Sequence, residues 1–380
     1  MRVKTVNVMF IILFMAMLIL PLAFIDLYGG AVSEKENRYL AARPPMSYAF
    51  QWPSDFIRQF DGWFADNVGF RDKLINSYSL AQKLENNVQY TDGSNVMLIG
   101  EQGHHYYAHI NGWMISKYQG KPFVSDEQLQ GLTNGLNSVN RYLDEKGIPF
   151  IVMFCTDKES IYPEYYPKSI KRGSEPIQLD IITAFLIENT DIDVFNIRER
   201  LLAEKERYLS YNKTGSMGEL THYNEIGAFF AYQELMWYIN FYFPELVPYT
   251  IDDIMITYDE REIPHISTKY EFLYKQLDTD FFDDVEIIRP FTTANSAFEN
   301  NNLDLPTILM LKDSYTQGGE LRMAKFIPQH FGKTILIHYT NIEYFYEYVD
   351  HYRPDIVVFE SAERELGIFA DYVSTLQDIG

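Results

Sequence analysis

The fold of this chain is decided by residues 307–315, which read Thr-Ile-Leu-Met-Leu-Lys-Asp-Ser-Tyr. The apolar start of this stretch predicts a buried strand, and polar residues follow that strand at once. Further apolar runs occur at 148–154, 333–338 and 355–359, and segments with helical spacing separate them. Because alternating strands and helices are typical of crossover connections, we expect an α/β domain with a parallel sheet flanked by helices.

The composition excludes several classes of protein. The chain has 380 residues, of which 47% are hydrophobic and 22% charged, so a disordered, collagen-like or disulfide-scaffold protein is excluded. The net charge of −21 argues against nucleic acid as a partner, because an acidic surface repels phosphates. The single cysteine, Cys155, excludes internal disulfides and cysteine-based metal clusters. We expect neither a metal nor a cofactor.

The N-terminus predicts a membrane segment. Arg2 and Lys4 precede an uncharged apolar run from Val8 to Ile25. As a helix with ~1.5 Å rise per residue, this run would be about 27 Å long, close to the hydrocarbon thickness of a bilayer. The basic flank should stay in the cytoplasm, which places residues 26–380 outside. We expect an uncleaved single-pass anchor with an extracytoplasmic C-terminal domain; secretion after cleavage of a signal peptide is the alternative.

The rest of the chain divides by composition. Residues 1–31 form the predicted transmembrane anchor or signal peptide, and residues 32–94 form a polar, proline-punctuated stalk with N-terminal helices. Residues 95–380 form the α/β domain. Within it, a polar stretch near 245–305 has only short β-like segments, which indicates an insertion.

Polar residues stand where the predicted strands end. In an open α/β sheet, ligands bind at the carboxyl ends of the strands, so these positions are candidates for a functional site. The candidate residues are Asp157, Lys158, Asp313, Ser314, Glu360 and Arg364.

Ser314 is the candidate nucleophile. A serine at a strand-to-helix turn exposes its hydroxyl, and its backbone N–H lies near a helix N-terminus that can stabilise an oxyanion. We expect that helix from Leu321 onward. His222 could take the serine proton, and a nearby acid could hold the imidazole tautomer. On capping statistics alone, Ser314 reads more simply as a helix N-cap.

Six short motifs occur in an order that resembles one known family. They lie at residues 36–40, 60–71, 98–103, 157–167, 312–315 and 353–364. This order is similar to that of the AlgJ/AlgX-type alginate O-acetylation proteins, whose catalytic domain is SGNH hydrolase-like. The resemblance implies an SGNH hydrolase-like fold in which the order of the catalytic blocks is permuted, because His222 precedes Ser314.

The acid position departs from the family. The family block reads Asp-Thr-His-Trp, whereas this chain reads Leu220-Thr-His222-Tyr. Leucine cannot accept a hydrogen bond from imidazole, and losing the orienting acid of a serine hydrolase costs up to ~10⁴-fold in turnover. Glu219, three residues before His222, could substitute for it. Lys312 also stands where the family has glycine.

The resemblance implies transfer of acetyl groups onto a cell-surface or exported polysaccharide. Ser314 would carry the acetyl group, His222 would act as base and then acid, and Glu219 would orient His222. Asp313 would shape the turn, and Asp157, Lys158, Glu360 and Arg364 would support the site. Because acetyl-CoA is absent outside the cell, the resemblance also implies a membrane-bound partner that exports acetyl groups.

Two alternatives remain open. An acyl esterase would use the same serine and histidine, because transfer to water or to sugar depends on pocket shape and water exclusion. An inactive glycan-binding or assembly component of the envelope is the second alternative, and Leu220 favours it.

Overall fold

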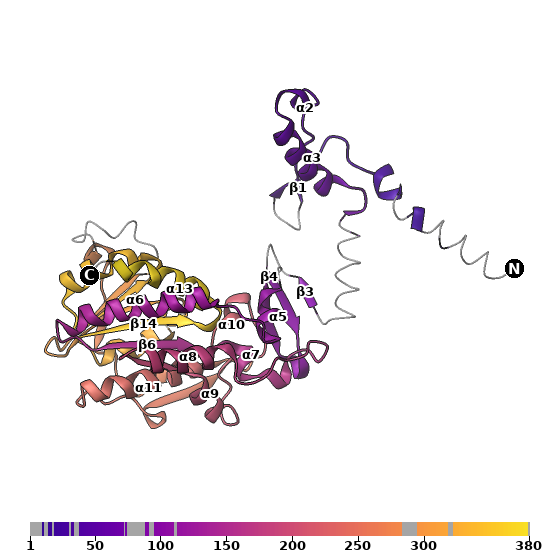
Figure 1. Ribbon diagram of the computed structural model, residues 1–380. Coiled ribbons are helices and arrows are strands. Elements are labelled where there is room, and N and C mark those ends of the chain that lie inside the picture. Colours follow the sequence, from indigo (N-terminus) through magenta and orange to yellow (C-terminus); the bar gives the residue numbers. More distant parts are fainter. Residues whose placement is uncertain are drawn as a thin grey trace. The chain divides into compact units, whose positions relative to one another are not determined.

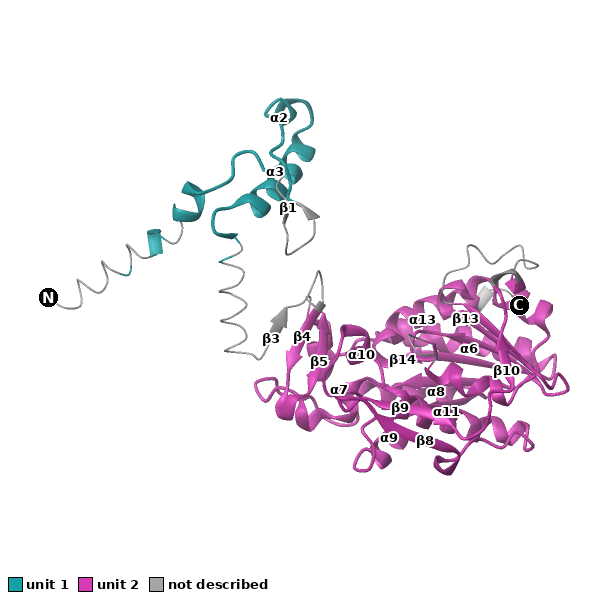
Figure 2. Cartoon of the chain, turned by 180° about the vertical axis from the view of Figure 1, so that it is seen from behind, with its two compact units in different colours: residues 1–93 teal, residues 94–380 magenta. Residues whose placement is uncertain are grey.

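The computed structural model describes residues 10, 14–16, 19–29, 32–33, 38–71, 73, 88–90, 95–109, 112–282, 295–317 and 322–378. The chain divides into two compact units, Met1–Gly93 and Ser94–Gly380, which Figure 2 draws in teal and magenta.

The first unit is built on a pair of helices. Helix α2 (Tyr48–Gln51) precedes helix α3 (Pro53–Asn67), which begins with proline because the first turn needs no N–H donor. The side-chain amide of Asn67 donates to the carbonyls of Ala41 and Trp63, at 2.7 and 2.8 Å, and ties the end of α3 to the segment before α2. The described strands of this unit are β1 (Val32–Ser33), β2 (Arg38–Tyr39) and β3 (Val88–Tyr90).

The prediction of an N-terminal transmembrane helix is wrong. Among the residues that the structure describes, no helix has both the length and the apolar character needed to span a bilayer. Within the run 8–25, the described helical positions end at Ala23, and residues 8–9, 11–13 and 17–18 lie outside the described residues. The predicted single-pass membrane location depended on that helix and is corrected with it.

A seven-stranded sheet forms the centre of the second unit (Figure 1). Five neighbouring strands are parallel, as predicted, but two more continue the sheet antiparallel at one edge, so the sheet is mixed rather than parallel. In sheet order, the strands are β10 (Tyr274–Gln276), β11 (Ser296–Asn300), β13 (Lys333–His338), β12 (Thr307–Lys312), β14 (Ile356–Ala362), β6 (Phe150–Cys155) and β7 (Asp193–Asn196).

The antiparallel edge comes from the segment expected to be an insertion. Strands β10 and β11 both lie within 245–305, as does the separate hairpin of β8 (Ile254–Tyr258) and β9 (Pro264–Thr268). An edge strand buries less surface than a central one and can keep polar side chains, as Tyr-Lys-Gln of β10 does. Such strands are therefore missed when strands are predicted from continuous apolar runs in the sequence.

Helices cover both faces of the sheet. Every residue of β6 is buried, and its side chains alternate between two cores, which explains its continuous apolar sequence. One core contains α9 (Arg198–Glu204) and α11 (Glu225–Tyr242). The other contains α6 (Asp126–Asp144), α8 (Gln178–Asn189), α12 (Phe345–Tyr352) and α13 (Leu366–Ser374).

The strand register brings the predicted site residues to one edge. Leu311 pairs with Phe359, and Ala362 pairs with Cys155, so β12, β14 and β6 end close together. Other elements near this edge are the hairpin of β4 (Asn95–Ile99) and β5 (His105–His109), helix α5 (Trp113–Tyr118), helix α7 (Lys158–Ile161) and helix α10 (Met217–Thr221).

Candidate active site

Ser314 is the exposed residue of a buried turn. The turn follows β12, and both neighbours, Asp313 and Tyr315, are buried. One carboxylate oxygen of Asp313 accepts the N–H of Tyr315 and the other accepts the N–H of Ala362, each at 2.7 Å. The N–H of Ser314 has no partner among the described residues. The turn is thus braced by Asp313, while both the hydroxyl and the N–H of Ser314 are free to meet a ligand.

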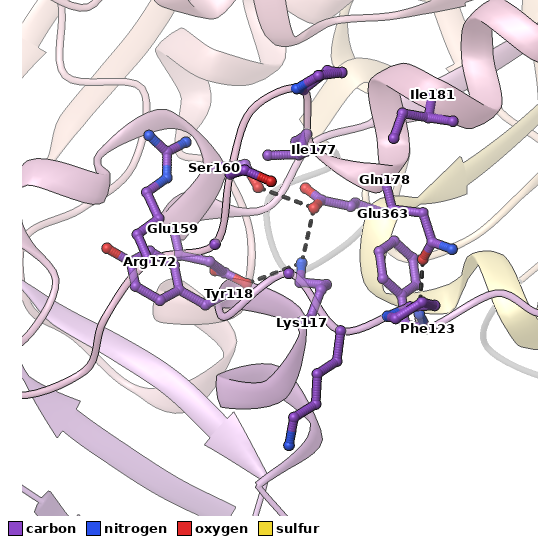
Figure 3. A pocket seen from close by; sticks show the side chains of 16 residues that line it. Lys117, Tyr118, Phe123, Glu159, Ser160, Arg172, Ile177, Gln178, Ile181 and Glu363 are labelled. Carbon is purple, nitrogen blue, oxygen red and sulfur yellow. Dashed lines mark hydrogen bonds and ion pairs between the residues drawn. The ribbon is translucent and has the colours of Figure 1, made fainter.

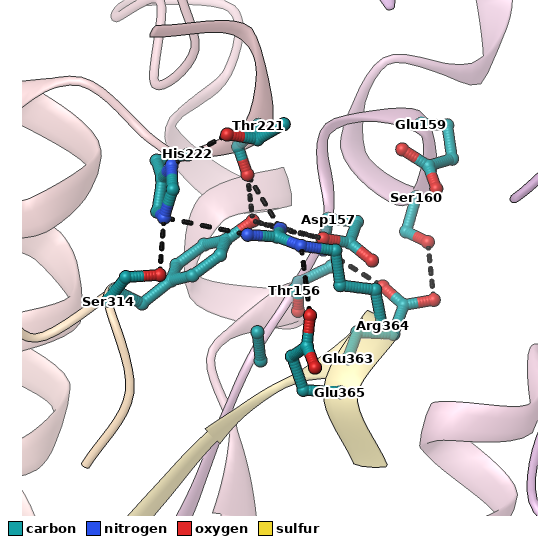
Figure 4. A network of polar contacts seen from close by, with 12 residues as sticks. Thr156, Asp157, Glu159, Ser160, Thr221, His222, Ser314, Glu363, Arg364 and Glu365 are labelled. Atoms are coloured by element: carbon teal, nitrogen blue, oxygen red, sulfur yellow. Dashed lines mark hydrogen bonds and ion pairs between the residues drawn. The ribbon is translucent and has the colours of Figure 1, made fainter. Parts of the chain in front are cut away.

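His222 lies in the short link between α10 and α11, and its Nε2 is 2.7 Å from Ser314 Oγ (Figure 4). On the other side of the ring, Nδ1 is 2.9 Å from the carbonyl oxygen of Gly218 and 2.8 Å from the hydroxyl of Thr221. A carbonyl can only accept, so Nδ1 carries the hydrogen and Nε2 is the acceptor. Imidazole is therefore in the tautomer that can remove the proton of Ser314.

The structure does not bring Glu219 to His222. Its Oε2 accepts the backbone N–H of Ser216 at 2.6 Å in a capping box at the start of α10, and its Oε1 lies 3.4 Å from Arg261. The capping box commits the Glu219 carboxylate to the start of α10, whereas His222 follows the end of that helix, so closeness in sequence did not place the carboxylate near the imidazole. Leu220, at the family's acid position, is a packed core residue. A backbone carbonyl occupies the place of the acid.

Burial and two nearby arginines make His222 a weak base. Burial, together with the positive charges of Arg322 and Arg364, lowers the pKa of His222 from 6.5 to about 2. The imidazole is therefore neutral at neutral pH and ready to accept a proton. The same charges oppose the imidazolium that proton transfer would create.

A second set of contacts holds the peptide before His222. Nη1 of Arg364 donates to the carbonyl of Thr221 and to Asp157 Oδ1, both at 2.7 Å, and to the hydroxyl of Tyr315 at 2.9 Å. The Tyr315 hydroxyl also lies 2.9 Å from the Thr221 carbonyl and 3.0 Å from Asp157. Burial alone would raise the pKa of Asp157, but Lys117 and Arg364 outweigh it and hold that pKa below its usual value. Asp157 and Arg364 thus fix the His222 peptide, as Figure 4 shows.

Lys117 joins this network from α5. Its ammonium lies 2.5 Å from Asp157, 3.0 Å from Glu159 and 3.1 Å from Glu363, all buried. Figure 3 shows Lys117 with Glu159 and Glu363. Burial raises the pKa of Glu159 to about 7. Glu363 accepts the N–H of Asp157 and the hydroxyl of Ser160, each at 2.9 Å. Lys117, Glu159, Ser160 and Glu363 line a cavity of about 240 Å³ that Figure 3 shows from close by.

Lys158 and Glu360 make hydrogen bonds close to the site, but neither is bonded to the serine hydroxyl in the described chain. The ammonium of Lys158 donates to the carbonyls of His105 (2.7 Å) and Asn212 (2.5 Å), and burial lowers its pKa to about 7. Glu360 accepts the N–H of Asp313 at 3.0 Å. Burial and the nearby carboxylate of Asp313 raise the pKa of Glu360 well above its usual value. Through this hydrogen bond, Glu360 stabilises the turn that carries Ser314.

The predicted helix after the serine is absent. The expectation placed a helix from Leu321 onward, but Leu321 lies outside the described residues, and the chain beyond it forms two 3-10 segments, Arg322–Lys325 and Ile327–Gln329. The described chain after Ser314 therefore supplies no α-helix N-terminus between residues 322 and 330. Proline at 328 and the tight 3-10 geometry account for the difference. Among the described residues, no group of three or more His, Cys, Asp or Glu side chains could hold a metal.

Sequence reasoning missed several members of the site. Glu159 directly follows Lys158, a predicted site residue, and that adjacency is a usable signal. Lys117 and Arg322 come from segments without any motif. The Gly218 carbonyl is a backbone atom, and a backbone atom leaves no trace in residue identity.

No protein-family model and no curated protein matches the chain, but solved structures do. PatB1 of Bacillus cereus covers 72% of this chain and 97% of its own length, with 15% sequence identity and a TM-score of 0.50. The chain shares the PatB1 fold. A DHHW family protein of Eubacterium siraeum covers 76% of this chain and 97% of its own, with 12% identity and a TM-score of 0.49. The O-acetyltransferase domain of Pseudomonas putida AlgJ covers 73% and 98%, with 14% identity and a TM-score of 0.44.

At these identities the similarity to PatB1 and its neighbours concerns the fold alone. The predicted resemblance to AlgJ/AlgX-type proteins is confirmed as a likeness of fold, which rests on the match to PatB1. In this PatB1-like fold, the contact between Ser314 and His222 is a feature of this chain's own side chains.

Proposed function

We propose that this protein is a serine-dependent O-acetyltransferase that moves acetyl groups onto a polysaccharide. The observation that carries the proposal is the 2.7 Å contact between Ser314 Oγ and His222 Nε2, with Nδ1 held by the Gly218 carbonyl. A nucleophile paired with a base whose tautomer is fixed by a third group is the arrangement that acyl transfer requires.

The reaction would proceed in two displacements. His222 Nε2 takes the proton of Ser314 while Oγ bonds to the acetyl carbonyl carbon, and it then returns the proton to the leaving oxygen as that carbon–oxygen bond breaks. A sugar hydroxyl next loses its proton to Nε2 and bonds to the carbonyl carbon of the acetyl-serine ester. Nε2 then returns the proton to Ser314 Oγ as the bond between Oγ and the acetyl carbon breaks. These steps need no metal or cofactor.

Two observations support the choice of an acetyl group and a glycan acceptor in this proposal: the motif resemblance and a cavity. The cavity, of about 420 Å³, is lined by Trp113 and Phe123 on one side and by Arg364, next to His222, on another. Aromatic faces combined with polar groups suit the alternating apolar and hydroxyl surfaces of sugar rings. The membrane-bound partner that would export acetyl groups stays a prediction.

One observation favours a second function, a glycan-binding protein without catalysis. His222 Nδ1 contacts a carbonyl and a hydroxyl rather than a carboxylate, and two cations lower its pKa. An imidazolium there would lack the negative charge that serine hydrolases supply. We place this reading second because the hydrogen bond to Ser314 would serve no purpose in it.

Turnover of an activated ester separates these readings. Full-length protein is mixed with p-nitrophenyl acetate, with and without a panel of oligosaccharides, and compared with Ser314→Ala and His222→Ala. We expect nitrophenol release that both substitutions abolish, and acetylated sugar when an acceptor is present. Release without acetylated sugar would indicate an esterase. Equal rates for all three proteins, together with glycan binding, would support the binding protein.

A further inference from the structure

The two amino nitrogens of Arg364 are used very differently. Nη1 has three acceptors at 2.7–2.9 Å, from Asp157, Thr221 and Tyr315. Among the described residues, Nη2 contacts only His222 Nε2, at the long distance of 3.5 Å. The guanidinium is thus held rigidly by one nitrogen, while the other directs a nearly free donor at the Ser314–His222 contact (Figure 4).

We propose that Arg364 Nη2 and the backbone N–H of Ser314 together form the oxyanion hole of the reaction. This inference rests on the proposed function. An oxyanion hole needs preorganised donors that lie close to the reacting carbon and are not already satisfied. The Ser314 N–H has no partner among the described residues, and Arg364 Nη2 has only the long contact to His222 Nε2 there.

His222 links Arg364 to the reacting serine. Nε2 of His222 is shared by the 2.7 Å contact to Ser314 Oγ and the 3.5 Å contact to Arg364 Nη2. Nη2 therefore lies no farther from Oγ than the sum of these two distances. An oxyanion hydrogen-bonded to both donors needs to lie roughly 3 Å from each.

Proton transfer from Ser314 to His222 explains why Arg364 Nη2 should then donate a hydrogen bond to the substrate. When Nε2 takes the proton of Ser314, it stops being an acceptor, and the Arg364 N–H loses the partner it had. At the same moment, the electron pair of the carbonyl double bond moves onto oxygen as the Oγ–carbon bond forms. The new oxyanion is the nearest acceptor, and it offsets the repulsion between guanidinium and imidazolium. Collapse returns the electron pair, breaks the bond to the leaving oxygen and passes the proton from Nε2 to that oxygen.

The other cations near the serine fit this role less well. Arg322 donates Nη1 to the Tyr223 carbonyl at 2.9 Å and has no contact with Ser314 or His222 among the described residues. Lys312, which is 1% exposed, has no hydrogen bond or ion pair to either of them in the described chain. Arg364 alone among these three touches the reacting pair.

The test must separate binding of the oxyanion from positioning of His222, because Arg364 does both. Two variants make that separation. Arg364→Gln removes the charged donor, whereas Tyr315→Phe loosens the same Thr221 peptide and leaves Nη2 in place. Affinity is measured for a boronic acid, which adds to a serine hydroxyl as a tetrahedral anion and so mimics the charged intermediate.

We expect Arg364→Gln to bind the boronic acid about 100-fold more weakly and to lose turnover by a similar factor, the usual effect of removing one oxyanion donor. Tyr315→Phe should weaken boronate binding less than about tenfold, because it keeps the charged donor that would face the oxyanion. Added guanidinium ion should partly restore turnover to Arg364→Ala but not to Tyr315→Phe. Arg364→Lys provides a second variant if Arg364→Gln does not fold.

Equal weakening of boronate binding by Arg364→Gln and Tyr315→Phe, without guanidinium rescue, would overturn the inference and leave the proposed function intact. An absence of Ser314-dependent turnover in the wild type would overturn both.

Discussion

The carbonyl oxygen of Gly218 lies 2.9 Å from Nδ1 of His222, four residues further along the chain. In this position a serine hydrolase ordinarily has a carboxylate. The carbonyl fixes the tautomer of the imidazole as an acid would, but it brings no full negative charge. The site is therefore geometrically prepared for acyl transfer and electrostatically weak.

If the carbonyl performs the orienting role, the charge of Glu219 is dispensable. Glu219→Gln keeps the capping box, because glutamine serves at that position too. We expect turnover within about twofold of wild type, whereas Thr221→Val should reduce it about threefold to tenfold by removing a neutral hydrogen bond to Nδ1. Steady-state kinetics measure both. A loss approaching 10⁴-fold in Glu219→Gln would mean that Glu219 is the orienting acid after all.

Restoring the family's acid should not restore a triad. Leu220 is 1% exposed and packs in the core, so Leu220→Asp buries a carboxylate away from a ring nitrogen that already has its partner. We expect a loss of at least about 3 kcal/mol in the free energy of unfolding and no gain in turnover. Urea denaturation and kinetics test this, with Leu220→Asn as the uncharged control. A tenfold gain in turnover for Leu220→Asp would contradict the prediction.

The acylation rate should be insensitive to pH where histidine ordinarily titrates. Because the pKa of His222 is lowered to about 2, the imidazole stays neutral as pH falls from 8 to 5. An unfolded histidine gains a proton near pH 6.5, so this residue destabilises the fold as pH falls through that value. Single-turnover rates should stay flat. The pKa of Glu159 is raised to about 7, so its titration could be mistaken for that of His222, and Glu159→Gln serves as a control without it. In that variant, an acylation rate that falls with a midpoint near pH 6.5 would contradict the prediction.

The cavity beside Arg364 predicts a local requirement for one tryptophan. Trp113 lines that cavity, whereas Trp237 of α11 is 55% exposed and lines none of the cavities described for this chain. We expect Trp113→Ala to raise the KM for a glycan acceptor about tenfold, the effect of losing one aromatic contact, and Trp237→Ala to leave it unchanged. Nitrophenyl acetate turnover should survive both substitutions. Equal KM values for Trp113→Ala and wild type would remove the cavity from the acceptor path.

Asp157 should matter greatly for stability. It pairs with both Lys117 and Arg364 in the interior, so Asp157→Asn leaves two buried cations without their shared partner. We expect a loss of about 3–5 kcal/mol in the free energy of unfolding. The exposed pair of Lys146 and Asp350 provides the control, because Asp350→Asn should cost less than about 1 kcal/mol. Urea denaturation measures both losses. Similar losses in the two variants would show that the buried network stabilises the fold no more than an exposed ion pair does.

The sequence predicted the parts of the fold that depend on buried apolar runs. Residues 307–311 and 148–154 were recognisable because parallel strands covered on both faces need apolar side chains at every position. The position of Ser314 at the end of β12 followed from that. The antiparallel strand β10 was not recognisable, because an edge strand of three residues carries no such signal. The apolar run 8–25 led to the opposite error, an expected spanning helix that the described structure lacks.

From the sequence, only those contacts of the candidate site that side chains make could be predicted. Residue types placed Ser314 and His222 at the same edge, and the structure joins them at 2.7 Å. Spacing in sequence suggested Glu219, but the helical turn of α10 directs its carboxylate to Ser216 instead. The contact that orients His222 comes from the backbone of Gly218, and the geometry of that turn exists only in the folded chain.

The most direct test of the central claim is to locate the acetyl group on the protein itself. Wild type, Ser314→Ala and His222→Ala would be mixed with the activated acetyl ester, quenched in acid and analysed by peptide mass spectrometry. The account predicts one acetyl group on Ser314 in wild type, none on residue 314 of Ser314→Ala, and strongly reduced labelling in His222→Ala. Labelling of other residues without Ser314, or labelling of Ser314 that does not depend on His222, would contradict it.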